Sequence, residues 1–590
     1  MKSFLKTVLA SLVALFIFTI LFLVFLGGLI STQEIAPRIE KKTLLTLNLQ
    51  VPISDRQPRQ KFADVLDAAL QERAQGRQTL REVVTAIDRA VEDERISGLF
   101  IKGNVVRDGY YSGWATLREV REAIDRFRQS GKPVITWQES LDEATLYVVS
   151  PAGKIVLHPL GLMEFNGLAA EVIYFRDAFE KYGIEVQATR VGKYKSAVEP
   201  FLRSHMSEEN REQLEGLLGD LFQELLAAVA RSRSVNPGDL LALSRDRGAL
   251  TAPEALEAGY VTAVGYYDQV LEELRELTGT KQGKPIERQL SVGEYFAATQ
   301  KKASGKGKVV VIYAEGMILS GDDEDEVGGD YLARLLRKAR EDDQVKAVVL
   351  RVNSPGGSAS ASDVIQRETV LLKKEKPFVV SLGTVAASGG YWISVYGDEL
   401  WAEPNTITGS IGVFGLFLSL KELMNEHGLN VDVVRTSPFA DIYSIFRPKT
   451  ERELALVQRI VDRIYEQFLD KVAEGRKLDR QRVHEIAQGR VWSGKEAQKL
   501  GLVDHIGGLK QAIAAAARRA ELGETYAIEE YQRAEELMEV LLKELGMLPE
   551  ENDDAQSPDM RLFWQRLQGL LHYTDRQGVY ARMPFDLTIH

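Results

Sequence analysis

The chain repeats its own sequence at an interval of about 245 residues, and this repeat limits the folds that it can adopt. Segments of the first part recur in the second part in the same order, each as an apolar strand-like run or a helix-like run. The matched segments are 42–49 and 308–315, 80–90 and 331–340, 96–102 and 345–351, 132–137 and 376–381, 181–190 and 426–435, and 250–261 and 492–503. A repeat of this length is too long for a solenoid unit and is typical of a duplicated domain.

Both copies alternate short β-branched strands with helical segments, which predicts an α/β fold with mostly parallel strands. We expect the first copy at residues 42–300 and the second copy at 308–515, joined by a basic, glycine-containing linker at 301–307. Residues 516–590 form a tail that begins with an alanine-rich, charged helix and continues as an acidic, irregular stretch. The sequence indicates no function for this tail.

The N-terminal region, residues 1–41, contains an uncharged apolar run at 8–30. A helix of that length spans about 34 Å, which is enough to cross the roughly 30 Å hydrocarbon core of a bilayer. Lys2 and Lys6 precede the run, so the positive-inside rule predicts a single-pass anchor with the body on the outer side of the cytoplasmic membrane, in the periplasm. The alternative is a cleaved signal peptide, which normally has a shorter apolar region and an A-x-A-like end that this run lacks.

Charge and cysteine content exclude several classes of function. There are 74 Lys and Arg residues against 85 Asp and Glu residues, giving a net charge of −11, so the chain lacks the basic field of a nucleic-acid binder. Cysteine is absent, which excludes disulfides, Cys-ligated metals and a thiol nucleophile. The acidic run at 322–326 is interpreted as a solvated loop, with a cation site as the alternative. We therefore expect no cofactor and no metal.

Glycine- and serine-rich segments of the second copy are the candidates for chemistry. Segment 353–358 directly follows a predicted strand, and its two consecutive glycines can turn backbone N–H groups toward a cleft. Segment 386–391 follows another strand and opens a short helix, which places Ser388 at a strand-to-helix junction. Segment 406–413 is a loop of small residues. Taken singly, each motif is equally compatible with a tight turn or close packing.

A serine nucleophile needs a base, and the sequence favours lysine over histidine. None of the seven histidines lies in a context resembling a catalytic loop, and Ser388 is not in a G-x-S-x-G motif. Lys195 lies among apolar residues in the segment 190–201 of the first copy, where desolvation could lower its pKa. A solvated surface lysine is the alternative reading of that position.

Comparison of the two copies links Ser388 with Lys195. Aligning the copies places Ala144 opposite Ser388, so the first copy lacks the hydroxyl. Aligning Arg190 with Arg435 places Ala440 opposite Lys195, so the second copy lacks the amine. Each copy has the group that the other is missing, which predicts one composite site per chain.

With these motifs the chain resembles the signal peptide peptidase A family in its long tandem form, also called protease IV. The segments that carry the resemblance are 194–201, 353–357, 386–392 and 409–412. It implies duplicated Clp-protease/crotonase-like domains after the single transmembrane helix, and a Ser/Lys-dyad serine endopeptidase that degrades cleaved signal peptides and other unfolded, hydrophobic peptides. It also implies a homotetramer that forms a dome with its mouth toward the bilayer.

The resemblance also implies a role for each residue that matches the family's motifs. Ser388 would be the nucleophile, Lys195 the general base and Ser410 a hydroxyl that orients the lysine amine. The oxyanion donors would be the N–H of Gly389 and that of either Gly356 or Gly357. Two other readings stay open: an acyl-CoA-type enzyme on the same fold, and a non-catalytic membrane scaffold whose small-residue loops only pack.

Overall fold

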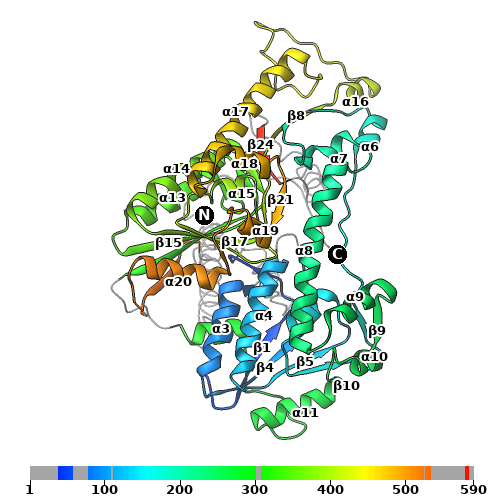
Figure 1. The fold of residues 1–590 in the computed structure, drawn as a ribbon, viewed down its shortest axis with the longest axis vertical. Helices are drawn as coiled ribbons and strands as arrows, with labels where there is room; N and C mark the ends of the chain where they lie inside the picture. Colours follow the sequence, from blue (N-terminus) through cyan, green and yellow to red (C-terminus); the bar gives the residue numbers. More distant parts are fainter. Residues whose placement is uncertain are drawn as a thin grey trace, which may run out of the picture.

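Each copy of the repeat builds its own mostly parallel sheet, and the two sheets follow one another along the long axis of the molecule (Figure 1). The computed structural model describes residues 38–57, 78–107, 111–300, 307–523, 525–532 and 579–583. The predicted α/β organisation with mostly parallel strands is confirmed. The predicted membrane span at 8–30 lies outside the described residues; within the described ranges, no helix combines the length and apolar character needed to cross a bilayer.

The sheet of the first copy is parallel throughout. Its order is β10 (Ala263–Val264), β6 (Lys154–Leu157), β5 (Val134–Gln138), β4 (Ile96–Lys102), β1 (Thr43–Asn48) and β11 (Gln289–Ser291). Helix α3 (Leu80–Glu92) packs against helix α4 (Trp114–Gln129) beside this sheet. Helix α3 begins with a capping box, because the Thr79 side chain accepts from Glu82 N–H and the Glu82 carboxylate accepts from Thr79 N–H.

The sheet of the second copy is buried on both faces. Its order is β21 (Val491–Ser493), β19 (Ile407–Gly409), β17 (Phe378–Ala387), β15 (Val345–Ser354), β12 (Lys308–Glu315) and β23 (Ala527–Glu530), with β18 (Glu399–Ala402) and β22 (His505–Ile506) branching from β17. Alternate residues of β12 face opposite layers, so Val309 packs with α20 (Leu509–Arg519) and Val310 with α13 (Gly329–Glu341) and α14 (Ala359–Glu375). Helix α20 and strand β23 thus integrate the start of the expected tail into the second copy.

A third sheet joins the two copies. Its order is β14 (Val327–Gly328), β13 (Ile318–Leu319), β16 (Gly356–Ser358), β24 (Val579–Arg582), β20 (Val413–Ser419) and β8 (Glu185–Val191). Strand β8 belongs to the first copy and pairs antiparallel with β20 of the second copy. The remaining strands form two small pairs, β2 (Ile53–Ser54) with β3 (Gln78–Thr79), and β7 (Leu162–Glu164) with β9 (Ala249–Thr251).

Long helices in equivalent positions of the two copies frame these sheets. Helices α8 (Glu208–Arg233) and α17 (Glu451–Arg476) each begin after a hydroxyl cap, Ser207 or Thr450, and each ends at a left-handed residue. Helix α8 runs from the first copy up beside β21 of the second (Figure 1). The other α-helices among the described residues are α5 (Glu143–Val149), α6 (Arg176–Lys181), α7 (Glu199–Leu202), α9 (Pro237–Asp246), α10 (Ala252–Glu257), α11 (Tyr267–Thr278), α12 (Val292–Ala298), α15 (Gly389–Trp392), α16 (Lys421–Glu426), α18 (Arg480–Ile486) and α19 (Gly494–Lys499).

A buried charge cluster fills the interface between the two copies. The Arg351 guanidinium of β15 is fully buried and lies 2.8 Å from the Asp55 carboxylate and 2.9 Å from the Glu119 carboxylate, both of the first copy. Burial, reinforced by the charge of Asp55, raises the pKa of Glu315 to about 7. Burial, reinforced by the charge of Glu119, raises the pKa of Glu403 to about 8. The interface therefore contains carboxyl groups that take up protons on folding.

This cluster predicts that the protein loses stability as pH rises from about 5 to about 8. A carboxyl group whose pKa is raised by folding stabilises the folded state below its unfolded pKa, and that contribution is lost as pH rises through the folded pKa. Both Glu315 and Glu403 are buried at the interface, so each contributes to this loss. Glu315→Gln and Glu403→Gln should flatten the dependence of the melting temperature on pH, while the exposed control Glu257→Gln should not. Parallel slopes in all variants would contradict this account.

Candidate active site

Lys195 lies on a loop that the first copy inserts into the second. Strand β8 leads into this loop. A Cβ atom at Gly192 would lie 2.5 Å from the Gln488 carbonyl, so only glycine allows the two backbone segments to approach this closely. The loop continues into a short 3₁₀ helix, Ser196–Val198, and the Lys195 side chain is completely buried. The sequence-based alternative of a solvated surface lysine is therefore wrong.

Ser388 lies between the end of β17 and the start of α15. Its φ of 55° and ψ of −114° are unusual for a residue with a side chain, a form of local strain that costs on the order of 1–3 kcal/mol and concentrates at functional sites. Its N–H donates to the Gly409 carbonyl at 2.8 Å, which fixes the junction against β19. The strand-to-helix position predicted for Ser388 is thus observed.

The lysine amine and the serine hydroxyl meet across the interface between the copies. Lys195 Nζ lies 2.8 Å from Ser388 Oγ, 3.0 Å from Ser410 Oγ and 3.1 Å from the Ser410 carbonyl oxygen. Desolvation by burial lowers the pKa of Lys195 well below its ordinary value. A neutral amine has two N–H donors and one lone pair, so it can donate twice to Ser410 and accept from the Ser388 hydroxyl.

Ser410 is held in place by its own backbone. It follows β19 with a φ of 50°, and its N–H donates to the Arg490 carbonyl at 2.7 Å. A Cβ atom at Gly412 would lie 3.1 Å from Lys195 Cδ, and one at Gly489 would lie 2.6 Å from Lys195 Cβ. Gly412 and Gly489, which lie on two different segments, therefore make the room that the buried lysine occupies.

The three glycines predicted as oxyanion donors lie together, and their backbone N–H groups have different surroundings. The Gly356 N–H donates to Ser354 Oγ at 3.2 Å. Gly356 has a φ of +96°, and a Cβ atom there would lie 2.6 Å from Gly389 N. Gly357 stands opposite Ala581 in the β16–β24 ladder. Because Met583 N–H donates to the Pro355 carbonyl, the alternation of an antiparallel ladder directs the Gly357 N–H toward Ala581.

The chain's own strand β24 lies beside these glycines. It pairs antiparallel with β16 on one side and with β20 on the other. A Cβ atom at Gly356 would lie 2.2 Å from the Ala581 carbonyl oxygen, and one at Gly389 would lie 3.0 Å from it. A backbone carbonyl of an extended segment therefore sits beside the glycines next to Ser388.

A polar cluster that the sequence analysis missed anchors the lysine loop. Gln213 on α8 donates to the Tyr194 carbonyl at 3.1 Å and to Ser196 Oγ at 3.0 Å, and its carbonyl accepts from Val491 N–H of the second copy. Asn210 accepts from Ser196 Oγ at 2.8 Å. No sequence signal marks these residues, since polar side chains spaced along an amphipathic helix are ordinary on a protein surface.

The acidic run at 322–326 behaves as a loop. Asp323 accepts from Glu326 N–H at 2.7 Å, and Asp322 pairs with Arg334. Within the part of the chain that the structure describes, no group of histidine, aspartate and glutamate side chains could hold a metal ion.

Comparison with known proteins decides the family. The sequence profile of peptidase family S49 matches residues 126–281 and 370–523, one stretch in each copy. The chain belongs to peptidase family S49. It is 34% identical over 538 residues to Protease 4 of Haemophilus influenzae, covering 87% of this chain and 86% of that protein. The predicted resemblance to protease IV is confirmed, and the protein is a serine peptidase.

Two further relatives extend this match to other lineages. Protease 4 of Salmonella typhi is 35% identical over 486 residues, which cover 80% of this chain and 78% of that protein. The chloroplastic serine protease SPPA of Arabidopsis thaliana is 30% identical over 494 residues, covering 82% of this chain and 70% of that protein. The duplicated S49 organisation thus extends over most of the chain.

Proposed function

We propose that this S49 peptidase uses Ser388 as nucleophile and Lys195 as general base. The observation that carries the proposal is the 2.8 Å contact between Lys195 Nζ and Ser388 Oγ, made by a lysine whose pKa burial lowers well below its ordinary value. Lys195 accepts the Ser388 proton as Oγ attacks the peptide carbonyl, and it then protonates the departing amine. Water hydrolyses the acyl-enzyme by the same route. Ser410 positions the amine because its hydroxyl oxygen accepts a hydrogen bond from one of the amine N–H groups.

The oxyanion donors of this mechanism are the N–H groups of Gly389 and Gly357. Of the two glycines that the sequence left open, Gly356 already donates its N–H to Ser354 Oγ. Gly357 directs its N–H toward the Ala581 carbonyl of β24, at the position that we propose for a scissile carbonyl. Donors fixed by the backbone need no reorganisation as charge develops on the oxygen.

The substrate of this site is an extended, unfolded peptide. Strand β24 supports this proposal, because its backbone fits between β16 and β20 as an added strand. Folded proteins cannot offer such a strand, whereas hydrophobic signal peptide remnants can. We also propose that both domains belong to the Clp-protease/crotonase-like class. The body lies on the periplasmic side of the cytoplasmic membrane and is anchored by residues 8–30. The protein assembles as a homotetramer and has no nucleic-acid partners.

Labelling and hydrolysis test this function together. Incubation of the full-length, detergent-solubilised protein with a fluorophosphonate probe should modify Ser388, which mass spectrometry of the digest identifies. Peptide reporters with leucine or alanine before the scissile bond should be cut faster than the same reporter with aspartate there. An unlabelled Ser388 would instead favour the acyl-CoA-type enzyme or the scaffold, and equal cleavage of the aspartate reporter would contradict the apolar preference.

Removing strand β24 should lower the KM for peptide substrates several-fold without lowering kcat. A peptide must displace β24 before it can bind, so the strand competes with every substrate. A chain ending at residue 578 lacks the strand, and a chain ending at Met583 retains it and serves as the matched control. Steady-state kinetics on both chains measure the effect. A KM that is unchanged or higher in the shorter chain would show that β24 does not compete.

A further inference from the structure

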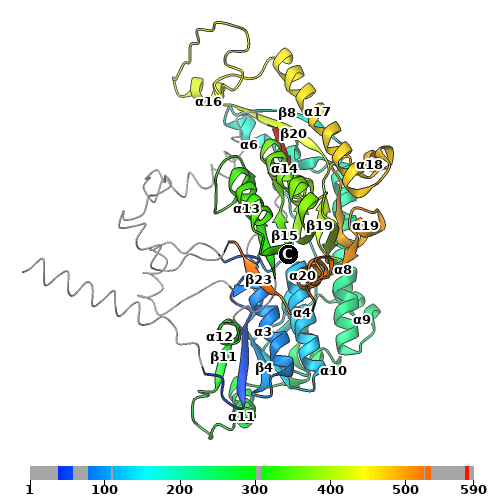
Figure 2. The ribbon, with the colours of Figure 1, turned by 90° about the vertical axis from the view of Figure 1, so that its left-hand side faces the viewer.

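A short segment of the second copy, residues 488–490, lies between two loops of the active site. It links α18 to β21, on the side of the molecule where α8 of the first copy also lies (Figure 2). The Gln488 carbonyl accepts from Tyr194 N–H of the lysine loop at 2.9 Å. The Arg490 carbonyl accepts from Ser410 N–H at 2.7 Å. The segment therefore bonds to both loops that contribute a partner to the active-site amine.

The Arg490 side chain returns to the lysine loop. Its guanidinium donates to Tyr194 OH at 3.1 Å and to the Glu212 carboxylate of α8 at 2.8 Å, and Tyr194 OH donates to Glu212 at 2.9 Å. Arg490 Cζ also lies 4.7 Å from the centre of the Tyr194 ring and 4.5 Å from that of the Trp492 ring. A guanidinium suits this place because it donates through its edge and stacks through its faces. We call Tyr194, Glu212 and Arg490 the clamp.

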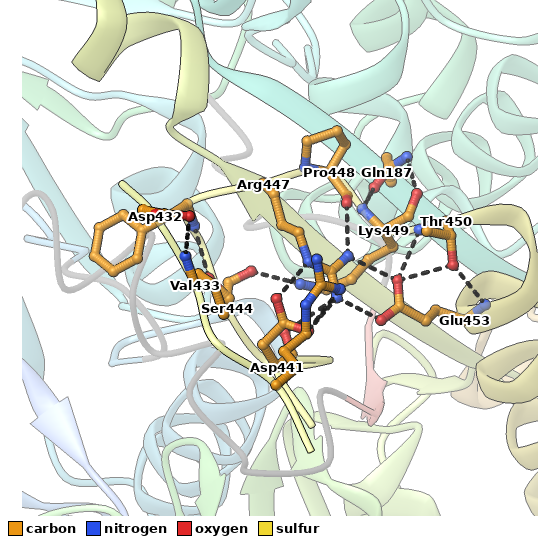
Figure 3. A network of polar contacts seen from close by, with 12 residues as sticks. Gln187, Asp432, Val433, Asp441, Ser444, Arg447, Pro448, Lys449, Thr450 and Glu453 are labelled. Atoms are coloured by element: carbon orange, nitrogen blue, oxygen red, sulfur yellow. Dashed lines mark hydrogen bonds and ion pairs between the residues drawn. The ribbon is translucent and has the colours of Figure 1, made fainter. Parts of the chain in front are cut away.

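The clamp holds the backbone from which the buried lysine side chain starts. Tyr194 directly precedes Lys195, and a Cβ atom at Gly489 would lie 2.6 Å from Lys195 Cβ. Strand β8, which leads into this loop, has a separate anchor, because Gln187 exchanges hydrogen bonds of 2.6 Å and 3.1 Å with the backbone of Lys449 (Figure 3). Loss of the clamp should therefore loosen the loop without unpairing the strand.

Burial, rather than a neighbouring charge, lowers the pKa of Lys195. The hydrogen bonds that Lys195 Nζ makes within the described chain go to oxygen atoms of Ser388 and Ser410. Because desolvation sets this pKa, water that enters beside a loosened loop would raise it toward its ordinary value. The charged groups on the elements around this loop are Arg190 of β8, Lys193, Glu199 of α7, Glu212 of α8 and Arg490.

We propose that Arg490 is a positioning residue of the peptidase reaction, which holds the lysine loop where the amine meets Ser388 and water stays out. Its backbone fixes Ser410 and its side chain fixes Tyr194, so one residue of the second copy aligns the loops on both sides of the amine. Arg490 acts through these neighbours rather than on the reacting atoms. The inference deepens the proposed function and rests on its Ser388/Lys195 mechanism.

The pH dependence of peptide hydrolysis by the full-length, detergent-solubilised protein tests this role. Arg490→Gln should lower kcat near neutral pH about tenfold and change KM less than about twofold, because the strands β16 and β20 stay in place. The rising limb of the rate should move up by about one pH unit, so that most of the activity returns at alkaline pH. Arg490→Lys should not restore the natural limb, since an ammonium group has neither the fork nor the flat face.

Two further variants separate positioning from folding. Glu212→Gln weakens the clamp from a side chain that is 56% exposed, and it should move the limb in the same direction by a smaller amount. If Arg490→Gln does not fold, Glu212→Gln alone decides. The matched control is Arg480→Gln on α18, which removes an arginine that pairs with Asp470 and Glu466 of its own copy, and it should leave kcat and the limb unchanged.

Three results would overturn the role of Arg490: an unshifted limb in the clamp variants, a loss of kcat that is equal at every pH, or the same shift in Arg480→Gln. Failure of the dyad is read separately, from fluorophosphonate labelling of Ser388 in Lys195→Ala. Labelling as fast as in the natural protein would exclude the dyad. Lost labelling in Lys195→Ala together with a natural pH limb in the clamp variants would remove the clamp alone.

Discussion

Ser388→Ala and Lys195→Ala should each reduce kcat by at least about 10⁴-fold, and the double variant should be no worse than either single variant. The reason is that the two groups act as one unit, since the serine attacks only when the amine accepts its proton. Hydrolysis of an alanine reporter by equal amounts of folded protein measures the effect. Multiplied losses in the double variant would show that the two residues contribute separately.

A neighbouring lysine supplies the control for this experiment. Lys193 is exposed and lies two residues before Lys195, so Lys193→Ala should keep near-normal activity. Lys195→Arg should not restore activity, because a guanidinium stays protonated at any accessible pH. In the natural protein the rate should rise with pH as the buried amine loses its proton, which is the direction set by its lowered pKa. An active arginine variant would exclude Lys195 as the base.

Gly356→Ala should lower kcat by about 10²–10³-fold, as much as the loss of one oxyanion donor usually costs, because the added methyl group takes the place of the substrate carbonyl. The added Cβ atom would lie 2.2 Å from the position of the bound carbonyl oxygen and 2.6 Å from Gly389 N, and the φ of +96° disfavours alanine. The substrate carbonyl can then no longer sit beside the donors. Kinetics on a short peptide, together with melting curves, measure the loss and verify folding.

A glycine in open space is the matched control. No atom would lie within 4 Å of a Cβ atom at Gly293, so Gly293→Ala should leave kcat unchanged. If Gly356→Ala melted like the natural protein and kept full activity, the oxyanion site would have to lie elsewhere.

The sequence allowed the composite site to be predicted because the repeat acts as an internal comparison. Ala144 and Ala440 mark what each copy lacks, and one composite site between the two copies is the economical explanation of this pattern. The structure places Lys195 and Ser388 in contact. The sequence could not decide whether Gly356 or Gly357 is the oxyanion donor. That choice depends on which of the two N–H groups donates a hydrogen bond to the Ser354 hydroxyl.

Other features depend on contacts that no local pattern encodes. Gln213 supports the lysine loop from a helix that begins only after that loop, and Asp55 and Glu119 meet Arg351 across the interface. Strand β24 is short, and it forms a strand only because β16 and β20 both pair with it. Residues 426–435 match a strand of the first copy, yet 430–436 form none, since a strand needs a partner as well as a pattern.

Strand β24 belongs to the same polypeptide as the two strands that it joins, so dilution does not remove it. A tethered competitor keeps its effective concentration at any protein concentration, whereas a free peptide competes by its own concentration. Under the proposed competition, we expect peptides concentrated at a membrane surface to be cut more readily than the same peptides dispersed in bulk. We therefore expect a low rate toward sparse chain ends and a higher rate where discarded peptides accumulate.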